Sequence, residues 1–280
     1  MRKLCVIGDP VEHSKSPLIQ NAMIKAAGLD CVYDAQRVAG SDTALWLEQT
    51  KKEGYIGFNA TMPHKENLVP LMNELSEDAA LFRSVNTVCI KNGRLYGYNT
   101  DGDGFLQALR EADMEPAGKT VLVLGAGGAA KAVVSKLARA GAGRVFVANR
   151  TVERAQALCA QVGGDKLVPC DFSRETLCRR AAQSQLVVNC TSLGMTGTGG
   201  QFDGLSFLAE LKPGAGVFDL IYSPACTELI KTAQGLGHRV SNGLGMLVWQ
   251  AVFALEHFTE TKLDGPAMAA VARKALEEKL

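Results

Sequence analysis

The chain has 280 residues, 47% of them hydrophobic, and 30 Lys and Arg nearly balance 29 Asp and Glu, so the formal net charge is +1. This balance argues against nucleic acid or a membrane surface as a partner, and no apolar run approaches the roughly 18 residues of a membrane span. Length and composition are those of an ordinary globular protein of about two domains.

Strand-like and helix-like runs alternate from the first residues, which is typical of an α/β protein. The Asn92-Gly93 pair stands between two strand-like runs and predicts a hairpin, which places an antiparallel pair in an otherwise parallel sheet. In this first part we expect strands at 3–9, 31–38 and 56–62, the hairpin at 87–99, and helices at 16–30, 42–54, 65–73, 76–83 and 104–114.

A second α/β series begins after the Pro and Gly residues of 115–119, which suit a domain boundary. Two helical runs with no strand between them end the sequence, so we expect these helices to fold back onto the first half. The predicted domains are therefore 1–103 plus 245–280, and 104–244. The strand-like runs of the second series lie within 120–128, 144–150, 166–171, 185–191, 216–222 and 238–242, and the last two helices at 245–260 and 265–280.

The stretch "VLVLGAGGAAKAVVSKLARAG" places Gly125, Gly127 and Ala130 as G-x-G-x-x-A between an apolar strand and a helix. Glycine at these positions allows a tight turn and a close approach of backbone N–H groups to a pyrophosphate. Because the complete strand-turn-helix context is present, we interpret this as a Rossmann-like dinucleotide site. The alternative is a glycine-rich turn that binds nothing.

The next strand ends in Asn149, Arg150 and Thr151, with Arg154 one helical turn further on. NAD-selective enzymes usually place Asp or Glu at this point for the ribose hydroxyls, whereas an uncharged Asn does not repel a 2′-phosphate. Arg150 can clamp that phosphate with charge-assisted hydrogen bonds, so we predict NADP over NAD. Alternatively, Thr151 caps the following helix and the arginines are solvated.

The stretch "NCTSLGM" at 189–195 ends a later strand, where loops of an open parallel sheet face the ligand. Thr191, Ser192 and Gly194 are therefore candidates for lining the ribose and nicotinamide, although a polar loop at any strand end is nearly as good an interpretation. The full set of predicted cofactor contacts is Gly125, Ala126, Gly127, Gly128, Ala129, Asn149, Arg150, Thr151, Arg154, Thr191, Ser192, Gly194, Leu220 and Gly243.

In the first half, Ser14 and Ser16 precede a predicted helix and could bind an anionic group together with helix amides, or cap the helix. Asn59, Thr61 and Lys65 follow the third strand. A lysine at the start of a helix opposes the helix dipole, which hints at a role other than helix formation.

The eight cysteines form no CxxC pair and no zinc spacing. The apolar stretch near the N-terminus is too short for a signal peptide. We expect a reduced, cytoplasmic protein without disulfides or a bound metal, and either a monomer or a homodimer.

Taken together, "GDPVEHSKSP", "NATMPHK", "NTVCIKNGRLYGYNTDGDG", "GAGGAAKA", "NRT" and "NGLGMLVWQ" resemble the shikimate dehydrogenase family over nearly the whole chain. The resemblance implies NADP-dependent interconversion of 3-dehydroshikimate and shikimate in aromatic amino-acid biosynthesis. It also implies a substrate-binding first domain, an NADP-binding Rossmann-like second domain, and C-terminal helices that return to the first domain.

The resemblance also assigns residues. Lys65 matches the catalytic lysine and Asp101 its aspartate partner, while Ser14 and Ser16 match the pair that binds the substrate carboxylate. Gln20 stands where many members have His, and Ala60 where many have Val. The substrate hydroxyls would be bound by Asn59, Thr61, Asn86, Asp101 and Gln250, with Tyr222 near the substrate.

Chemically, hydride transfer to a carbonyl leaves an alkoxide that needs a proton, and Lys65 with Asp101 would act as one coupled titrating unit with Lys65 as the proton carrier. Asp101 could instead only begin the next helix, a role open also to Thr100 or Asp103. Two other functions remain open: a quinate or dual-specificity dehydrogenase using NAD or NADP, and a non-catalytic NADP-binding sensor. Ser16, where quinate-preferring relatives often have Thr, favours shikimate.

Overall fold

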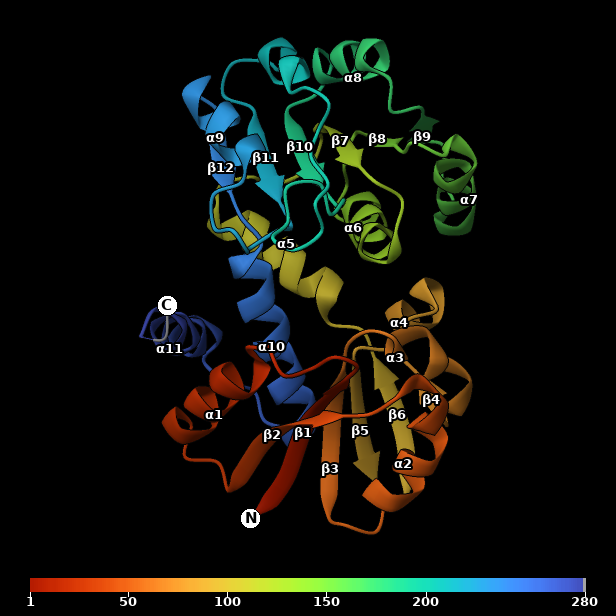
Figure 1. Cartoon of the computed structure of the whole chain (residues 1–280), viewed down its shortest axis with the longest axis vertical. Helices are drawn as coiled ribbons and strands as arrows, with labels where there is room; N and C mark the ends of the chain where they lie inside the picture. The colour runs from red at the N-terminus through yellow and green to blue at the C-terminus, as the bar shows by residue number, and fades with distance from the viewer. Residues whose placement is uncertain (279–280) are drawn as a thin grey trace. The chain divides into compact units, whose positions relative to one another are not determined.

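The computed structural model describes residues 1–278, and packing divides the chain into two compact units. Unit 1 consists of Met1–Gly104 with Val248–Leu280, and unit 2 consists of Phe105–Leu247 (Figure 1). Helix α5 (Asp101–Glu111) and helix α10 (Leu244–Thr259) each begin in one unit and end in the other. Each unit has its own sheet, so the predicted α/β fold with two units is confirmed.

The sheet of unit 1 has the strand order β2-β1-β3-β5-β6-β4. The pairs β1–β2, β1–β3 and β4–β6 are parallel, whereas β5 runs antiparallel to both β3 and β6. The β5–β6 turn is Asn92-Gly93, with φ of +50° and +74°, which confirms the predicted hairpin. The strands are β1 Arg2–Gly8, β2 Cys31–Arg37, β3 Tyr55–Ala60, β4 Glu74–Leu75, β5 Thr87–Lys91 and β6 Arg94–Tyr98.

The single helix expected at 65–73 is wrong. A four-residue helix, α3 (His64–Asn67), is followed by a 3-10 turn at Val69–Leu71. Pro70 lies in that turn, and because proline has no backbone N–H it cannot continue an α-helical ladder. The pairing of β4 with β6, which the sequence pattern did not indicate, follows this break. The other helices before the hairpin are α1 Ser16–Ala26, α2 Thr43–Thr50 and α4 Glu77–Phe82.

The C-terminal helices return to the first half of the chain, as predicted. Helix α11 (Gly265–Glu277) packs against α1, and its buried face consists of Met268, Ala269, Ala272 and Leu276. Asp264 caps α11 by accepting a hydrogen bond from the Ala267 N–H at 3.1 Å. A segment remote in sequence thereby completes the core of unit 1.

The sheet of unit 2 has the order β12-β11-β10-β7-β8-β9, and all of these pairs are parallel. The order reverses between β7 and β10, which is the switch point where doubly wound sheets bind ligands. The strands are β7 Thr120–Leu124, β8 Arg144–Ala148, β9 Leu167–Cys170, β10 Leu186–Asn189, β11 Gly216–Asp219 and β12 Arg239–Ser241.

Helices cover both faces of this sheet, which explains why the central strands β7, β10 and β11 are almost entirely buried. Val121 and Val123 of β7 belong to one buried cluster, and Leu122 and Leu124 to another on the opposite face. The first cluster includes residues of α5, α6 (Gly128–Arg139) and α7 (Val152–Val162), and the second includes residues of α8 (Arg174–Ala181) and α9 (Glu228–Gly235).

No helix within residues 1–278 has the length and apolar character of a membrane span. Over the same part of the chain, His, Cys, Asp and Glu side chains do not gather in groups of three or more that could hold a metal ion.

Candidate active site

The topology of the first sheet brings most of the predicted substrate residues to one edge. Strands β1 and β3 are parallel neighbours, so the segments that follow them leave the same edge. The antiparallel β5 begins at this edge because Asn59 lies opposite Thr87, and β6 ends there because Thr87 lies opposite Tyr98. The predicted residues that flank these strand ends are Ser14, Ser16, Thr61, Lys65, Asn86 and Asp101.

Lys65 and Asp101 form an ion pair in which Nζ lies 2.6 Å from Oδ2. Their side chains are 33% and 18% exposed, so the pair is partly buried yet accessible to solvent. Asp101 is the first residue of α5, so it begins the helix as well as pairing with the lysine. A cation and a carboxylate arranged in this way can hold and move a proton beside a bound small molecule.

The residue before the lysine anchors the short helix α3. His64 is fully buried; its Nε2 donates to the Val38 carbonyl at 2.8 Å, and its Nδ1 lies 2.9 Å from Thr43 Oγ1. The Lys65 carbonyl in turn accepts a hydrogen bond from the Val85 N–H at 2.8 Å. The His64 side chain and the Lys65 carbonyl thereby connect α3 to three other residues, which restricts where the Lys65 side chain can reach.

Asn86 orients the carboxylate of Asp101. Asn86 Nδ2 donates to Asp101 Oδ1 at 2.8 Å and to Thr100 Oγ1 at 3.0 Å. Asn59 Nδ2 donates to the Asn86 carbonyl at 3.0 Å and to Thr87 Oγ1 at 2.9 Å. Because protein groups engage the N–H groups of both amides, a substrate contact through those groups would require exchange of a protein hydrogen bond.

The other predicted substrate residues of unit 1 lie on the flanking segments. Helix α1 begins at Ser16, and Ser14 Oγ accepts a hydrogen bond from the Ser16 N–H at 3.3 Å, so Ser14 supports the turn into the helix. A Cβ on Gly8 would lie 2.5 Å from the Thr61 methyl carbon, so the position of Thr61 depends on that glycine. Gln250 is half-buried on α10.

In unit 2 the loop between β7 and α6 leaves an open space above the helix N-terminus. Gly125 has φ of +101°, and a Cβ on it would lie 3.0 Å from the Thr191 methyl carbon. Gly127 and Gly128 are exposed, and a Cβ on either would meet no atom of the described residues within 4 Å beyond its immediate chain neighbours. This space at the N-terminus of α6 fits the pyrophosphate of a dinucleotide.

Asn149 connects this loop to the end of β8. Its Oδ1 accepts a hydrogen bond from the Ala126 N–H at 3.2 Å, and its Nδ2 donates to the Thr151 carbonyl at 2.8 Å. Thr151 is the N-cap residue of α7, but its side chain accepts no capping hydrogen bond from the described residues. Arg150 and Arg154 are exposed, so an uncharged amide and two accessible guanidinium groups fit a 2′-phosphate.

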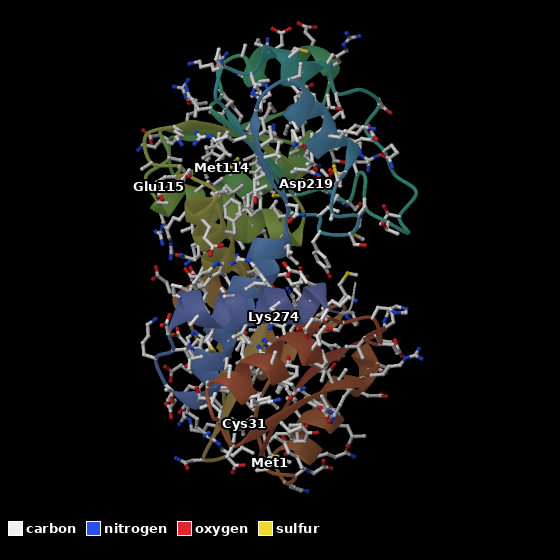
Figure 2. The ribbon with its side chains drawn as sticks, turned by 90° about the vertical axis from the view of Figure 1, so that its left-hand side faces the viewer. Met1, Cys31, Met114, Glu115, Asp219 and Lys274 are labelled. Atoms are coloured by element: carbon white, nitrogen blue, oxygen red, sulfur yellow. The ribbon has the colours of Figure 1, made fainter. Side chains whose placement is uncertain are left out.

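Asp219, labelled in Figure 2, lies at the end of β11 and is fully buried. Its Oδ1 accepts hydrogen bonds from Asn189 Nδ2 at 2.9 Å and the Ile221 N–H at 3.1 Å, and its Oδ2 accepts one from Thr227 Oγ1 at 2.6 Å. Asn189 Oδ1 then accepts from Thr191 Oγ1 at 2.7 Å. Burial raises the pKa of Asp219, although these donors oppose the shift.

The remaining predicted residues of unit 2 lie on these same loops. Ser192 is exposed, and Gly194 has φ of +93°, a conformation that favours glycine. A Cβ on Gly243 would lie 1.9 Å from the Leu220 carbonyl oxygen, so only glycine fits against that strand end. Tyr222 is 43% exposed and belongs to unit 2, whereas the other predicted substrate residues belong to unit 1.

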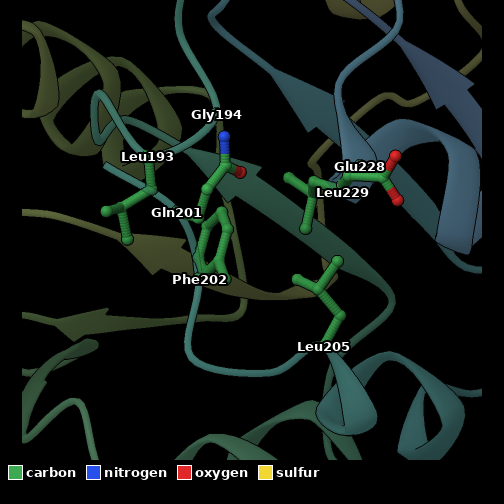
Figure 3. A pocket seen from close by; sticks show the side chains of 7 residues that line it. All are labelled: Leu193, Gly194, Gln201, Phe202, Leu205, Glu228 and Leu229. Atoms are coloured by element: carbon green, nitrogen blue, oxygen red, sulfur yellow. The ribbon is translucent and has the colours of Figure 1, made fainter. Parts of the chain in front are cut away.

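A pocket of about 240 Å³ lies beside Gly194 (Figure 3). Its lining is mostly apolar, which suits neither a pyrophosphate nor a hydroxylated acid, and Gly194 belongs both to this lining and to the predicted cofactor contacts. The lining residues are Leu193, Gly194, Gln201, Phe202, Leu205, Glu228 and Leu229.

Several residues that hold the site together have no role in the sequence predictions. Asn189 and Asp219 could have been found, because a polar side chain at the end of an apolar strand must have hydrogen-bond partners. His64 belongs to the stretch "NATMPHK", in which no role was predicted for the histidine. Tyr33, whose hydroxyl donates to Asn59 Oδ1 at 2.7 Å, lies within β2 and not at its end, so the sequence gives no sign that its hydroxyl needs a partner.

Comparisons with known proteins agree with this arrangement. The family model described as shikimate dehydrogenase substrate binding domain matches residues 6–88, and the model described as shikimate / quinate 5-dehydrogenase matches residues 108–195. A relative from Geobacter sulfurreducens named shikimate dehydrogenase (NADP(+)) is 41% identical over 280 residues, which cover 98% of this chain and 97% of the relative.

Two solved structures extend the similarity to the whole fold. Shikimate 5-dehydrogenase of Thermus thermophilus, in complex with NADP(H) and shikimate, has a TM-score of 0.85 at 33% identity and covers 98% of this chain and 100% of its own. The enzyme from Listeria monocytogenes, in complex with shikimate and NAD, has a TM-score of 0.88 at 30% identity, with coverage of 97% and 96%. The chain therefore belongs to the shikimate dehydrogenase family.

Proposed function

We propose that this chain catalyses the NADP-dependent, reversible reduction of 3-dehydroshikimate to shikimate in aromatic amino-acid biosynthesis. It is an oxidoreductase that acts on a CH–OH group. The observation that carries the proposal is the Lys65–Asp101 ion pair, in which Nζ lies 2.6 Å from Oδ2. The pair lies at the edge of the sheet where β1 and β3 end.

Bound NADPH would supply the hydride, and residues of unit 1 donate or accept the proton. As the substrate carbonyl becomes an alkoxide, the cationic Nζ of Lys65 stabilises the developing negative charge and transfers a proton to that oxygen. In the reverse direction Lys65 accepts the hydroxyl proton. Asp101 holds Nζ in place through Oδ2 and binds a substrate hydroxyl.

The remaining predicted residues bind the two ligands. Ser14 and Ser16 bind the carboxylate of the acid, and further contacts come from Asn59, Thr61, Asn86, Gln250 and Tyr222. In unit 2 the Gly125–Ala129 loop receives the pyrophosphate, and Arg150 and Arg154 bind the 2′-phosphate. The open space at Gly127 and Gly128 supports this assignment. We also propose that the protein works in the cytoplasm as a monomer or a homodimer.

The assigned chemistry is tested by Lys65→Ala. We expect this change to abolish shikimate oxidation, measured by absorbance of the reduced nicotinamide, while NADPH binding, measured by fluorescence titration, stays within about twofold of the parent. A variant that keeps most of its rate would contradict the role of Lys65.

Substrate and cofactor are tested with the parent protein by crossing shikimate and quinate with NADP and NAD. We expect rapid reduction of the cofactor only in the combination of shikimate with NADP. Comparable rates with quinate or NAD would overturn the proposed specificity while leaving the chemistry intact. Absence of turnover in every combination, with NADPH still bound, would favour the non-catalytic sensor.

A further inference from the structure

A continuous series of hydrogen bonds runs through the buried part of unit 1 and ends at the catalytic carboxylate. Tyr33 Oη lies 2.7 Å from Asn59 Oδ1, and Asn59 Nδ2 lies 2.9 Å from Thr87 Oγ1. Thr87 Oγ1 lies 2.9 Å from Asn86 Oδ1, and Asn86 Nδ2 lies 2.8 Å from Asp101 Oδ1. We call these five residues the donor series.

Main-chain partners set the direction of these bonds. Asn59 Nδ2 also contacts the Asn86 carbonyl oxygen at 3.0 Å, which can only accept, so this end of the amide carries the N–H groups. Asn86 Oδ1 contacts the Thr100 N–H at 2.9 Å, which can only donate. Thr87 accepts from Asn59 and therefore donates its own hydroxyl proton to Asn86. Every bond of the donor series thus points toward Asp101.

The four residues of the donor series that precede Asp101 are shielded from water. Tyr33, Asn59, Asn86 and Thr87 are 2%, 7%, 3% and 0% exposed. Burial raises the pKa of the Tyr33 hydroxyl, which keeps its proton and stays a donor. In such a low-dielectric interior, hydrogen bonds aligned in one direction polarise and strengthen one another.

The series ends on one particular oxygen of the carboxylate. Its last donor, Asn86 Nδ2, occupies Asp101 Oδ1, whereas Lys65 Nζ contacts Oδ2. A carboxylate that is held at one oxygen by a buried donor presents the other oxygen in a fixed direction, and the lysine amine is thereby held in a fixed place.

We propose that Tyr33 and Thr87 are positioning residues for the reaction: through Asn59 and Asn86 they orient the Asp101 carboxylate and hence Lys65. This inference rests on the proposed function, because it assigns an effect on the Lys65–Asp101 pair. Neither residue touches the reacting atoms. Their removal should lower kcat much more than it raises KM for shikimate, since the chemical step depends on the geometry of the pair.

Thr87 allows a test that separates hydrogen bonding from packing. Thr87→Val keeps the shape and removes the hydroxyl, whereas Thr87→Ser keeps the hydroxyl and removes the methyl group. The matched control is Thr50→Val: Thr50 is also buried in unit 1, and its hydroxyl donates to the Trp46 carbonyl at 2.7 Å, outside the donor series.

Tyr33 provides an independent variant, which decides the question if Thr87→Val does not fold. Tyr33→Phe removes the first donor. Its matched control is Tyr55→Phe, because Tyr55 is a buried tyrosine of the same sheet whose hydroxyl accepts a hydrogen bond from Gln36 and does not belong to the donor series. Melting temperature and NADPH binding are measured for every variant to verify folding.

We expect Thr87→Val to lower kcat about tenfold with KM for shikimate changed less than about threefold, Thr87→Ser to recover most of the rate, and Tyr33→Phe to lower kcat about threefold. Thr50→Val and Tyr55→Phe should keep kcat within about twofold of the parent. The inference is overturned if folded Thr87→Val and Tyr33→Phe keep the parent kcat, if Thr87→Ser is as slow as Thr87→Val, or if the controls lose as much rate.

Lys65→Ala, measured in parallel, separates this inference from the proposed function. If the parent is active, Lys65→Ala is inactive and the donor-series variants are unchanged, the positioning role alone fails. If Lys65→Ala stays active, or the parent oxidises no shikimate, the proposed function fails and the inference fails with it.

Discussion

At the scale of the residue, Asp219 is a buried carboxylate that was not among the predicted site residues. Its hydrogen bonds nevertheless fix segments on which some of those residues lie. Three donors converge on its carboxylate: Asn189 from the end of β10, and Ile221 and Thr227 from the segment between β11 and α9. These hydrogen bonds favour the ionised form, but burial is the larger effect and raises its pKa above the ordinary value of 3.8. The ionised carboxylate therefore costs some stability while it connects the end of β10 with the segment between β11 and α9.

Because the pKa of Asp219 is higher in the folded than in the unfolded chain, the folded state binds the proton more tightly. Its contribution to the free energy of unfolding should therefore fall as pH rises from about 3.8 through the raised pKa, and stay lower above it. Asp219→Asn removes this titration. Urea unfolding followed by circular dichroism should give a stability difference, parent minus variant, that is larger near pH 4 than near pH 7. A difference that grows with pH would contradict the raised pKa.

At the scale of the element, strand β8 illustrates how the two ends of a parallel strand acquire different roles. Its carboxyl end leads into Asn149 and Arg150 beside the glycine loop, while its first residue, Arg144, is exposed at the opposite end. Arg144 and Arg150 thus lie at opposite ends of one strand. Only the carboxyl end, near Arg150, is on the ligand side of a doubly wound sheet.

Arg150→Ala should therefore raise KM for NADP about tenfold, because the proposed charge-assisted clamp on the 2′-phosphate is removed. KM for NAD, which lacks this phosphate, should change less than about twofold. Arg144→Ala is the control at the other end of the strand and should alter neither value. Steady-state rates with both cofactors test this, and an equal loss for NAD and NADP would refute the phosphate contact.

At the scale of the whole molecule, unit 1 is completed by residues from the end of the chain. Helix α11 closes onto α1 with a face that includes two alanines, and small side chains allow two helices to approach closely. Loss of this contact affects folding rather than the chemistry, because α11 carries none of the predicted site residues.

Leu276 is 4% exposed on α11, so Leu276→Ala should lower the free energy of unfolding by about 2–4 kcal/mol through lost burial and a residual cavity. Leu45 is 66% exposed on α2 of the same unit, and Leu45→Ala should change it by less than about 0.5 kcal/mol. Denaturant titrations of both variants provide the measurement. Equal effects would mean that α11 does not stabilise unit 1.

Much of this protein could be predicted from local patterns. Alternating apolar runs indicated the α/β fold, Asn92-Gly93 the hairpin, and Gly125 to Ala130 the nucleotide turn, because each is a short-range signal with its own steric reason. The helix expected at 65–73 was wrong because Pro70 interrupts it, and β4 was missed because a two-residue strand has no periodicity.

By itself, then, the sequence determined most of the elements and the glycine loop and led to the prediction that Lys65 and Asp101 are the reactive pair, since these depend on residues close together in the chain or on recognisable motifs. Only the tertiary structure decided that Asn59 lies opposite Thr87, that Asp101 is held at Oδ1 by Asn86, and that Asp219 is bonded to Asn189 at the end of β10. The physical reason is that a hydrogen bond depends on distances and directions within a few tenths of an ångström. Between residues far apart in sequence, sheet register and packing set those distances.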